Sequence, residues 1–126
     1  GKTAAFAIPI IHQLHRIVGS SKKAKQIRAL VVTPTRELAV QIGQNFDAYS
    51  KYTSINQLTI FGGVSQNPQV DSLKWGVDVL IATPGRLLDL HKQGFIDLDH
   101  LHTLVLDEAD RMLDMGFVND VKKIVK

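Results

Sequence analysis

The chain has 126 residues, which suits one domain, and its 44% hydrophobic and 21% charged content is ordinary for a globular protein. The formal net charge of +3 is compatible with a polyanionic partner but does not require one. The absence of cysteine excludes disulfides and thiolate metal sites, and no apolar run is long enough to cross a bilayer.

The chain begins at Gly1 without an initiator methionine, and no secretory signal follows. We therefore expect a piece of a longer, cytoplasmic protein that has no membrane association. Residues 4–18 carry apolar side chains at helical spacing, which predicts a helix that Pro9 kinks or whose start it shifts. Residues 19–21 end this helix, and the basic run at 22–28 is interpreted as a solvated loop.

Short apolar runs then alternate with helical patterns. Strands are predicted at residues 29–33, 58–61, 77–82 and 103–106. Helices are predicted at residues 38–49, 65–74 and 84–92, with a last helix from about Ala109 that breaks at Gly116. This alternation indicates an α/β fold, a parallel sheet with helices on both faces. Ligands of such sheets bind beyond the carboxyl ends of the strands, where the unusual motifs of this chain fall.

Two short motifs predict a nucleotide site. Gly1-Lys2-Thr3 matches the end of the P-loop pattern, in which the lysine reaches the β- and γ-phosphates and the threonine ligates Mg²⁺. Asp107 and Glu108 directly follow the last predicted strand. An aspartate there holds Mg²⁺, usually through water, and a neighbouring glutamate can deprotonate the attacking water. The alternatives are an arbitrary tripeptide and a helix N-terminus that favours acidic residues.

The acidic segment also carries a family resemblance. Residues 105–117, VLDEADRMLDMGF, resemble motif II of the DEAD-box RNA helicases, and Gly1-Lys2-Thr3 then resembles the tail of the family's motif I. The resemblance implies a RecA-like P-loop NTPase domain that uses ATP and Mg²⁺. It implies a catalytic set of Glu108, as the base, with Asp107 and Lys2. It implies a nucleotide-binding set of Gly1, Lys2, Thr3, Asp107, Glu108 and Asp110, and Mg²⁺ held by Thr3 and Asp107, largely through water.

Three further segments follow the first three predicted strands. They are Pro34-Thr35-Arg36-Glu37-Leu38-Ala39, Phe61-Gly62-Gly63 and Thr83-Pro84-Gly85-Arg86. Threonine can cap the helix that follows, glycine permits close backbone approach, and arginine near a helix start suits phosphate. The simpler alternatives are a surface salt bridge for Arg36 and an ordinary turn for the paired glycines.

These segments resemble motifs Ia, GG and Ib of the same family. The resemblance implies contacts with the sugar-phosphate backbone of RNA, which position the strand without reading its sequence. The implied RNA-binding residues are Pro34, Thr35, Arg36, Gly62, Gly63, Thr83, Pro84, Gly85 and Arg86. Residues 61–69 and 87–90 look most like the bacterial RhlE-type branch of the family.

The resemblance covers essentially the whole chain. It implies that residues 1–126 are part of the first of two RecA-like domains, with the adenine-recognising segment and the second domain outside them. The leading function is an RNA-stimulated ATPase that unwinds RNA duplexes or remodels ribonucleoproteins, and we expect the fragment alone to be inactive. The alternatives are a module that only binds a partner, and a DNA translocase or P-loop kinase.

Other conspicuous side chains are interpreted as packing residues. The five histidines lack the cysteine or carboxylate spacing of a zinc site. Trp75, Tyr49 and Tyr52 can stack on bases, but core or surface packing is the preferred interpretation. Met112 and Met115 are also interpreted as packing residues.

Overall fold

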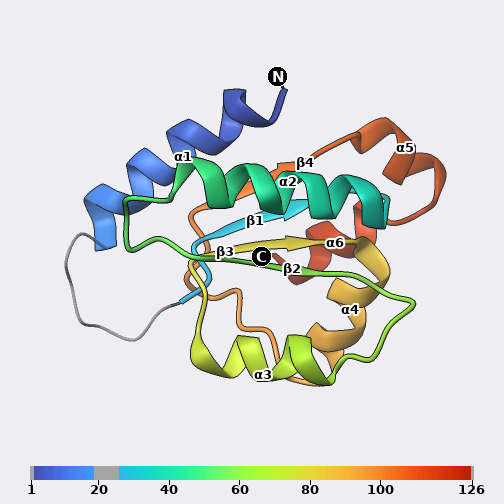
Figure 1. Cartoon of the computed structure of the whole chain (residues 1–126). Helices are drawn as coiled ribbons and strands as arrows, with labels where there is room; N and C mark the ends of the chain where they lie inside the picture. The colour runs from blue at the N-terminus through green and yellow to red at the C-terminus, as the bar shows by residue number, and fades with distance from the viewer. Residues whose placement is uncertain (1, 19–25, 126) are drawn as a thin grey trace.

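The computed structural model describes residues 2–18 and 26–125 as a parallel four-stranded sheet with helices on both faces (Figure 1). Its elements are, in chain order, α1 (Lys2–Val18), β1 (Ala29–Val32), α2 (Arg36–Tyr49), β2 (Gln57–Ile60), α3 (Asn67–Trp75), β3 (Val79–Ala82), α4 (Pro84–Lys92), β4 (Thr103–Leu106), α5 (Ala109–Asp114) and α6 (Val118–Ile124). The predicted alternation is confirmed. Pro9 lies inside α1 and does not delay its start, and Gly116 separates α5 from α6 as expected.

The strands lie in the order β2-β3-β1-β4, and all their pairings are parallel. Their ends are in register, because Val32 is aligned with Ala82 on one side and with Leu106 on the other. Ile60 is aligned with Ala82 in turn. The residues that follow the strands therefore emerge at the same edge of the sheet, called here the carboxyl edge.

Alternating side chains of the sheet build two separate cores. Leu30 and Val32 of β1 pack on the face that α3, α4 and α6 cover. Ala29 and Val31 pack on the opposite face, against α1 and α2 (Figure 1). Each fully buried leucine or valine side chain stabilises the fold by about 1.5–3 kcal/mol relative to an exposed one. Because β1 is buried on both faces, its sequence is an uninterrupted run of apolar residues.

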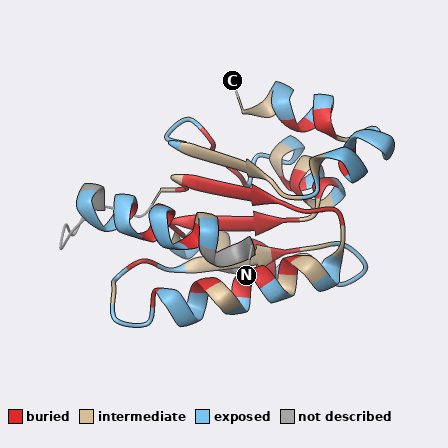
Figure 2. Cartoon of the chain, turned by 90° about the horizontal axis from the view of Figure 1, so that it is seen from above, coloured by how far each residue is buried: buried red, intermediate tan, exposed pale blue. Residues whose placement is uncertain are grey.

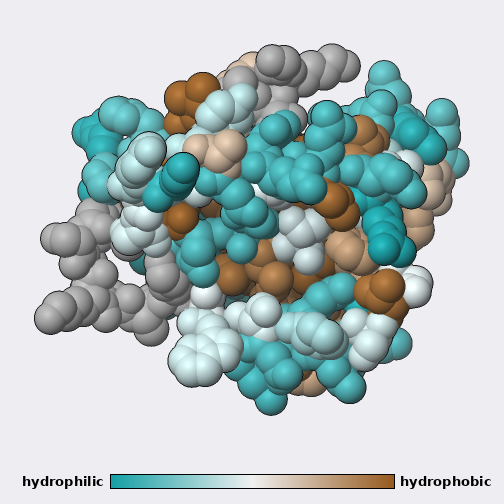
Figure 3. Space-filling model, viewed as in Figure 1, coloured by the Kyte–Doolittle hydropathy of each residue, from teal (hydrophilic) through white to brown (hydrophobic). Residues whose placement is uncertain are grey.

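The two outer strands are less covered than the two central ones. β1 and β3 are buried along their whole length, whereas β4 is half-buried throughout (Figure 2). β2 is half-buried except at Ile60, and hydrophobic surface is visible between α2 and α3, along this strand (Figure 3). Within residues 2–18 and 26–125, no helix combines the length and the apolar character needed to span a membrane.

Local signals explain where α2 starts and how it packs. The Thr35 hydroxyl accepts a hydrogen bond of 3.2 Å from the Leu38 amide, so the predicted cap is confirmed. In the middle of α2, Gly43 is buried against β2. A Cβ atom at this position would overlap the Thr59 hydroxyl, so glycine fits this close approach of helix and strand without a shift of the Thr59 side chain.

Candidate functional site

The sequence motifs that follow the strands meet at the carboxyl edge, as predicted. Backbone hydrogen bonds extend the sheet by one residue beyond three strands. The Thr33 amide donates to Ala82, the Thr83 amide to Ile60 and the Asp107 amide to Val32, over 2.8–3.1 Å. The sheet thus fixes the backbone of Thr83 and Asp107, which begin two of the motifs, and of Thr33, which directly precedes the motif at Pro34. Side chains on such a rigid base can be held in the defined geometry that a site needs.

Asp107 is oriented by a residue that sequence reasoning missed. The Thr33 hydroxyl donates a hydrogen bond of 3.2 Å to Asp107 Oδ2. Thr33 is fully buried, whereas Asp107 is half-buried. The bond fixes one carboxylate oxygen and leaves Oδ1 for a ligand. The sequence does show that Thr33 places a hydroxyl directly after four apolar residues. However, nothing in the sequence indicates that Asp107 is the partner of this hydroxyl.

Glu108 adopts an unusual backbone conformation. Its φ of 54° and ψ of 49° are left-handed, and it is the only non-glycine residue with positive φ in the described part of the chain. This conformation costs a residue with a Cβ about 1–2 kcal/mol. It turns the chain sharply between β4 and α5. Strain of this kind often occurs at functional sites, where the surrounding structure maintains it.

The acidic residues after β4 line an open depression. Its volume is about 340 Å³, and Glu108, Ala109, Asp110 and Arg111 border it. Glu108 Oε2 lies 4.0 Å from Arg111 Nη1, and both side chains are exposed, so this ion pair contributes little to stability. The neighbouring carboxylates are hard oxygen ligands, which suit Mg²⁺ rather than a soft metal. Asp107, the predicted ligand that directly precedes this depression, supplies an oxygen ligand of the same kind, so its chemistry fits Mg²⁺.

The first predicted motif lies largely outside the described residues. Gly1 and the side chains of Lys2 and Thr3 belong to the part of the chain that the structure does not describe. α1 runs opposite in direction to the strands, so its first turn lies toward the carboxyl edge (Figures 1 and 2). The expected proximity of Lys2 to Asp107 stays a prediction.

Arg36 is the first residue of α2 and is exposed. Its guanidinium carbon lies 4.8 Å from the centroid of the Phe61 ring, a cation–π contact between the segments after β1 and β2. The alternative that we considered, an ion pair with a nearby acid, does not appear among the salt bridges of the described residues. Pro34 is buried two residues earlier and fixes the turn.

The glycines of the other two motifs leave open backbone at the carboxyl edge. A Cβ atom at Gly62, Gly63 or Gly85 would meet no atom within 4 Å. Gly63 has a φ of 79°, so it is the residue of the pair that uses positive φ. Thr83 occupies the N-cap position of α4, with Pro84 after it, but its side chain makes no capping hydrogen bond. Thr83 is therefore the N-cap residue by position, as predicted, but the capping hydrogen bond of its hydroxyl is absent.

Arg86 is held by the protein itself. Its Nη1 donates to Gln69 Oε1 over 2.9 Å, and its Nη2 donates to the Val64 carbonyl over 2.8 Å. Gln69, a residue that the sequence motifs did not include, also donates from Nε2 to the Phe61 carbonyl over 3.2 Å. The three predicted RNA-binding segments are therefore connected through side chains, from Arg36 through Phe61 and Gln69 to Arg86.

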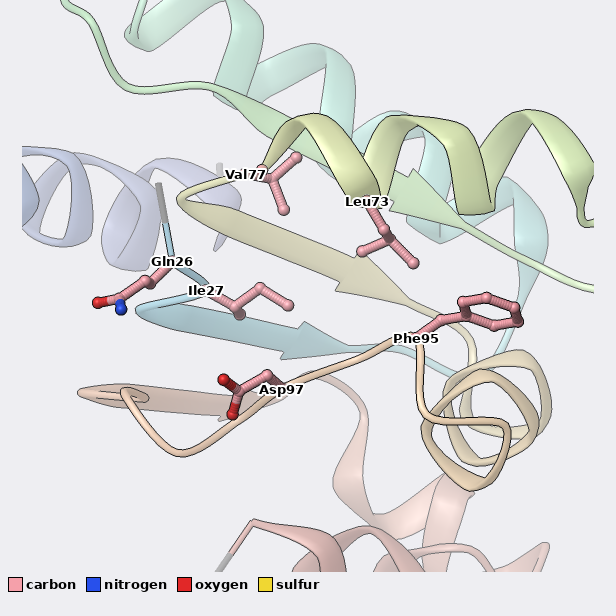
Figure 4. A pocket seen from close by; sticks show the side chains of 7 residues that line it. Gln26, Ile27, Leu73, Val77, Phe95 and Asp97 are labelled. Atoms are coloured by element: carbon pink, nitrogen blue, oxygen red, sulfur yellow. The ribbon is translucent and has the colours of Figure 1, made fainter. Parts of the chain in front are cut away.

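A second hollow lies away from the predicted site residues. It has a volume of about 120 Å³ near the amino ends of β1 and β3, where Ile27 and Val77 precede the strands. Leu73 of α3 and Phe95 from the segment after α4 border it, as Figure 4 shows. No residue of the sequence motifs contributes to its wall.

The side chains interpreted as packing residues divide into two groups. Met112 is fully buried, so its packing role is confirmed. Trp75 and Tyr52 are 89% and 92% exposed, and Met115 and Tyr49 are also exposed, so core packing is excluded for Trp75 and Tyr52, while packing on the surface stays a prediction. In the described ranges no group of three or more histidine and acidic side chains is placed to hold a metal ion.

Comparison with known proteins gives consistent matches. The family model "DEAD/DEAH box helicase" matches residues 1–126. The ATP-dependent RNA helicase RhlB of Pseudomonas putida is 46% identical over 128 residues, which cover 100% of this chain and 32% of that protein. The ATP-dependent RNA helicase DeaD of Buchnera aphidicola is 48% identical over 126 residues, which cover 99% of this chain and 20% of that protein.

Solved structures agree with these matches. A yeast DEAD-box splicing factor has a TM-score of 0.82 and 38% identity, covering 98% of this chain and 29% of that chain. A hypothetical ATP-dependent RNA helicase from Sulfolobus tokodaii has a TM-score of 0.83 and 39% identity, covering 98% of this chain and 34% of that chain. This chain thus spans about a third or less of the length of these relatives.

Proposed function

This chain belongs to the DEAD/DEAH box helicase family, and from that premise we propose that the whole protein couples ATP binding and hydrolysis to RNA unwinding or ribonucleoprotein remodelling. Its fold is that of the RecA-like domain of DEAD-box proteins. The observation that carries the proposal is the carboxyl edge, which joins the acids at Asp107 and Glu108 to the arginines at Arg36 and Arg86. The names of the relatives as ATP-dependent RNA helicases support it. The finer resemblance to the RhlE-type branch stays a prediction.

The acidic end of this edge is proposed to serve ATP. Asp107 would hold Mg²⁺ together with Thr3, largely through water, with Thr33 fixing the carboxylate. When bound, Mg²⁺ neutralises charge on the β- and γ-phosphates. The exposed Glu108 carboxylate would accept a proton from the attacking water.

The remaining nucleotide contacts rest on the family resemblance. Gly1, Lys2 and Thr3 would bind the phosphates at the start of α1, where backbone N–H groups and the helix dipole favour an anion. Asp110 would contribute from the first turn of α5, which borders the same depression as Glu108. We propose no direct RNA contact for these residues.

The other end of the edge is proposed to hold the sugar-phosphate backbone of single-stranded RNA. Arg36 and Arg86 supply charge, and the open backbone at Gly62, Gly63 and Gly85 permits close approach. Further contacts are proposed for the residues that shape the two helix starts, namely Pro34, Thr35, Thr83 and Pro84. Because these groups meet phosphate and sugar rather than base edges, binding is expected to depend on salt but little on sequence.

We propose that turnover also requires a second RecA-like domain in cis. The support is that this chain spans 32% of the Pseudomonas relative and 29% of the yeast structure. Residues 1–126 alone are therefore expected to show no appreciable RNA-stimulated hydrolysis. A cytoplasmic location is proposed because the two proposed ligands, ATP and RNA, meet there.

The test uses ATP hydrolysis by the full-length protein with single-stranded RNA, with single-stranded DNA and with neither. We expect stimulation by RNA alone. Stimulation by DNA would favour a translocase, and hydrolysis that neither polymer changes would favour a kinase or another P-loop enzyme. No hydrolysis under any condition, with RNA still bound, would favour a binding module.

A further inference from the structure

Gln69 is a polar residue buried at the start of α3. It is 8% exposed, and both ends of its amide are used. Oε1 accepts from Arg86, and Nε2 donates to the Phe61 carbonyl. A buried amide that loses either partner is destabilised, so this side chain is held in one orientation. The family motifs described above assign it no role.

The two partners of Gln69 belong to different RNA-binding segments. Arg86 also donates to Val64, so the loop at 61–64 is held at its first residue by Gln69 and at its last by Arg86. Gly62 and Gly63 lie between these two points and are exposed. Glycine loses more conformational freedom on ordering than any other residue. Without these bonds, the loop would have to be ordered by RNA at the moment of binding.

We propose that Gln69 is a positioning residue for RNA, which holds the Gly62-Gly63 backbone and the Arg86 guanidinium in one arrangement before RNA binds. This inference rests on the proposed RNA-binding function of the carboxyl edge. Ordering the loop in advance removes an entropy cost from association. A guanidinium has five N–H donors, and Gln69 and Val64 use two of them, so Arg86 can contact a phosphate while it stays in this network.

The test substitutes Gln69 in the full-length protein. Gln69→Met keeps the length of the side chain but removes both hydrogen bonds. Gln69→Glu keeps an acceptor for Arg86 and removes the donor to Phe61. The matched control is Gln93→Met, because Gln93 is an exposed amide of the α4 C-cap whose partners are Gln66 and Asp89 rather than Arg86.

We expect Gln69→Met to weaken single-stranded RNA binding about tenfold, the effect of losing a hydrogen bond to a charged group. ATP affinity without RNA should stay unchanged. The RNA affinity of Gln69→Glu should lie between that of Gln69→Met and that of the unsubstituted protein. The RNA affinity of Gln93→Met should equal that of the unsubstituted protein. Amide hydrogen exchange at residues 61–64 should be faster in Gln69→Met without RNA, a change that a general loss of stability would not confine to this loop.

A double-mutant cycle tests whether Gln69 acts through Arg86. In an Arg86→Ala background, Gln69→Met should weaken RNA binding by less than about threefold, because coupled residues are not additive. Unchanged RNA affinity in both Gln69 variants, or an equal loss of RNA and ATP affinity, would overturn this proposal alone. An unsubstituted protein that binds no RNA would overturn the proposed function and this inference with it. If Gln69→Met does not fold, the same measurements of RNA and ATP affinity are made on Gln69→Glu and compared with the Gln93→Met control.

Discussion

The Thr33 hydroxyl donates to the Asp107 carboxylate across 74 residues of sequence, over 3.2 Å. The two residues directly follow β1 and β4, which are neighbours in the sheet. The Asp107 amide also donates to Val32, so both the backbone and the side chain of Asp107 are held by the end of β1. A carboxylate held in this way needs little reorganisation to meet a ligand.

Replacing Thr33 by valine should therefore lower the ATPase rate. Thr33→Val keeps the shape of the side chain and removes the hydroxyl, so we expect the rate to fall about tenfold, as for loss of a hydrogen bond to a charged group. RNA affinity without nucleotide should not change. The measurement is steady-state hydrolysis by the full-length protein. Thr33→Ser, which keeps the hydroxyl, is the matched control, and equal rates for serine and valine would remove Thr33 from the site.

Replacing Glu108 by glutamine should separate chemistry from binding. Glu108→Gln keeps the size of the side chain and its capacity for hydrogen bonds but removes the proposed base. Single-turnover hydrolysis should fall about 10²-fold or more, the usual scale for loss of a general base. ATP-dependent RNA binding should remain close to that of the unsubstituted protein. A hydrolysis rate near that of the unsubstituted protein would exclude Glu108 as the base.

The backbone of Glu108 leads to a separate prediction about stability. Glycine adopts positive φ without the steric penalty that alanine meets. At a φ of 54°, Glu108→Gly should therefore be more stable than Glu108→Ala by about 1 kcal/mol. In an ordinary helix interior the order is reversed. The measurement is the free energy of unfolding of the two variants, from urea denaturation. A more stable alanine variant would show that Glu108 is not left-handed in solution.

The sequence was informative where the structure depends on local pattern. Apolar runs predicted the strands, because β1 and β3 are buried on both faces and leave no polar position. The place of the motifs at one edge followed from parallel strands alone. The roles of Thr33 and Gln69 could not be predicted in this way, since their partners lie far away in the sequence or in another element. The left-handed φ of Glu108 was also missed, because glutamate, unlike asparagine and aspartate, is not enriched in this conformation.

Substitution of Gly43 should destabilise the fold although it favours the helix. Alanine has a better helix propensity than glycine by about 1 kcal/mol. However, its Cβ atom would overlap the Thr59 hydroxyl of β2, and overpacking of this kind costs about 1–3 kcal/mol.

We therefore expect Gly43→Ala to lower the free energy of unfolding by up to about 2 kcal/mol, the difference between these two effects. Thermal and urea denaturation of the full-length protein provide the measurement. Adding Thr59→Ala removes the overlapping oxygen and should restore part of the loss. If the double variant is instead as unstable as the sum of the single variants, the contact between Gly43 and Thr59 is not the cause.

The last prediction concerns the charge of Arg86. Arg86 lies in the first turn of α4, half-buried, with two donors used by Gln69 and Val64. If its remaining donors meet a phosphate, Arg86→Ala should weaken binding to unrelated single-stranded RNAs by similar factors, because phosphate contacts carry no sequence information. The slope of log affinity against log salt should become shallower by about one unit, as one phosphate contact is lost.

Two further readouts make this prediction specific. ATP affinity without RNA should barely change, since Arg86 is not proposed to bind the nucleotide. Discrimination between RNA and DNA should also survive, because it would depend on contacts with the 2′-hydroxyl rather than on this charge. Arg16→Ala is a suitable control, because Arg16 is an exposed arginine near the end of α1, in the last turn, and the motifs give it no role. Arg86→Ala could instead change the preference for RNA sequence and leave the salt slope unchanged. That result would show that the carboxyl edge does not bind RNA through the sugar-phosphate backbone of the RNA.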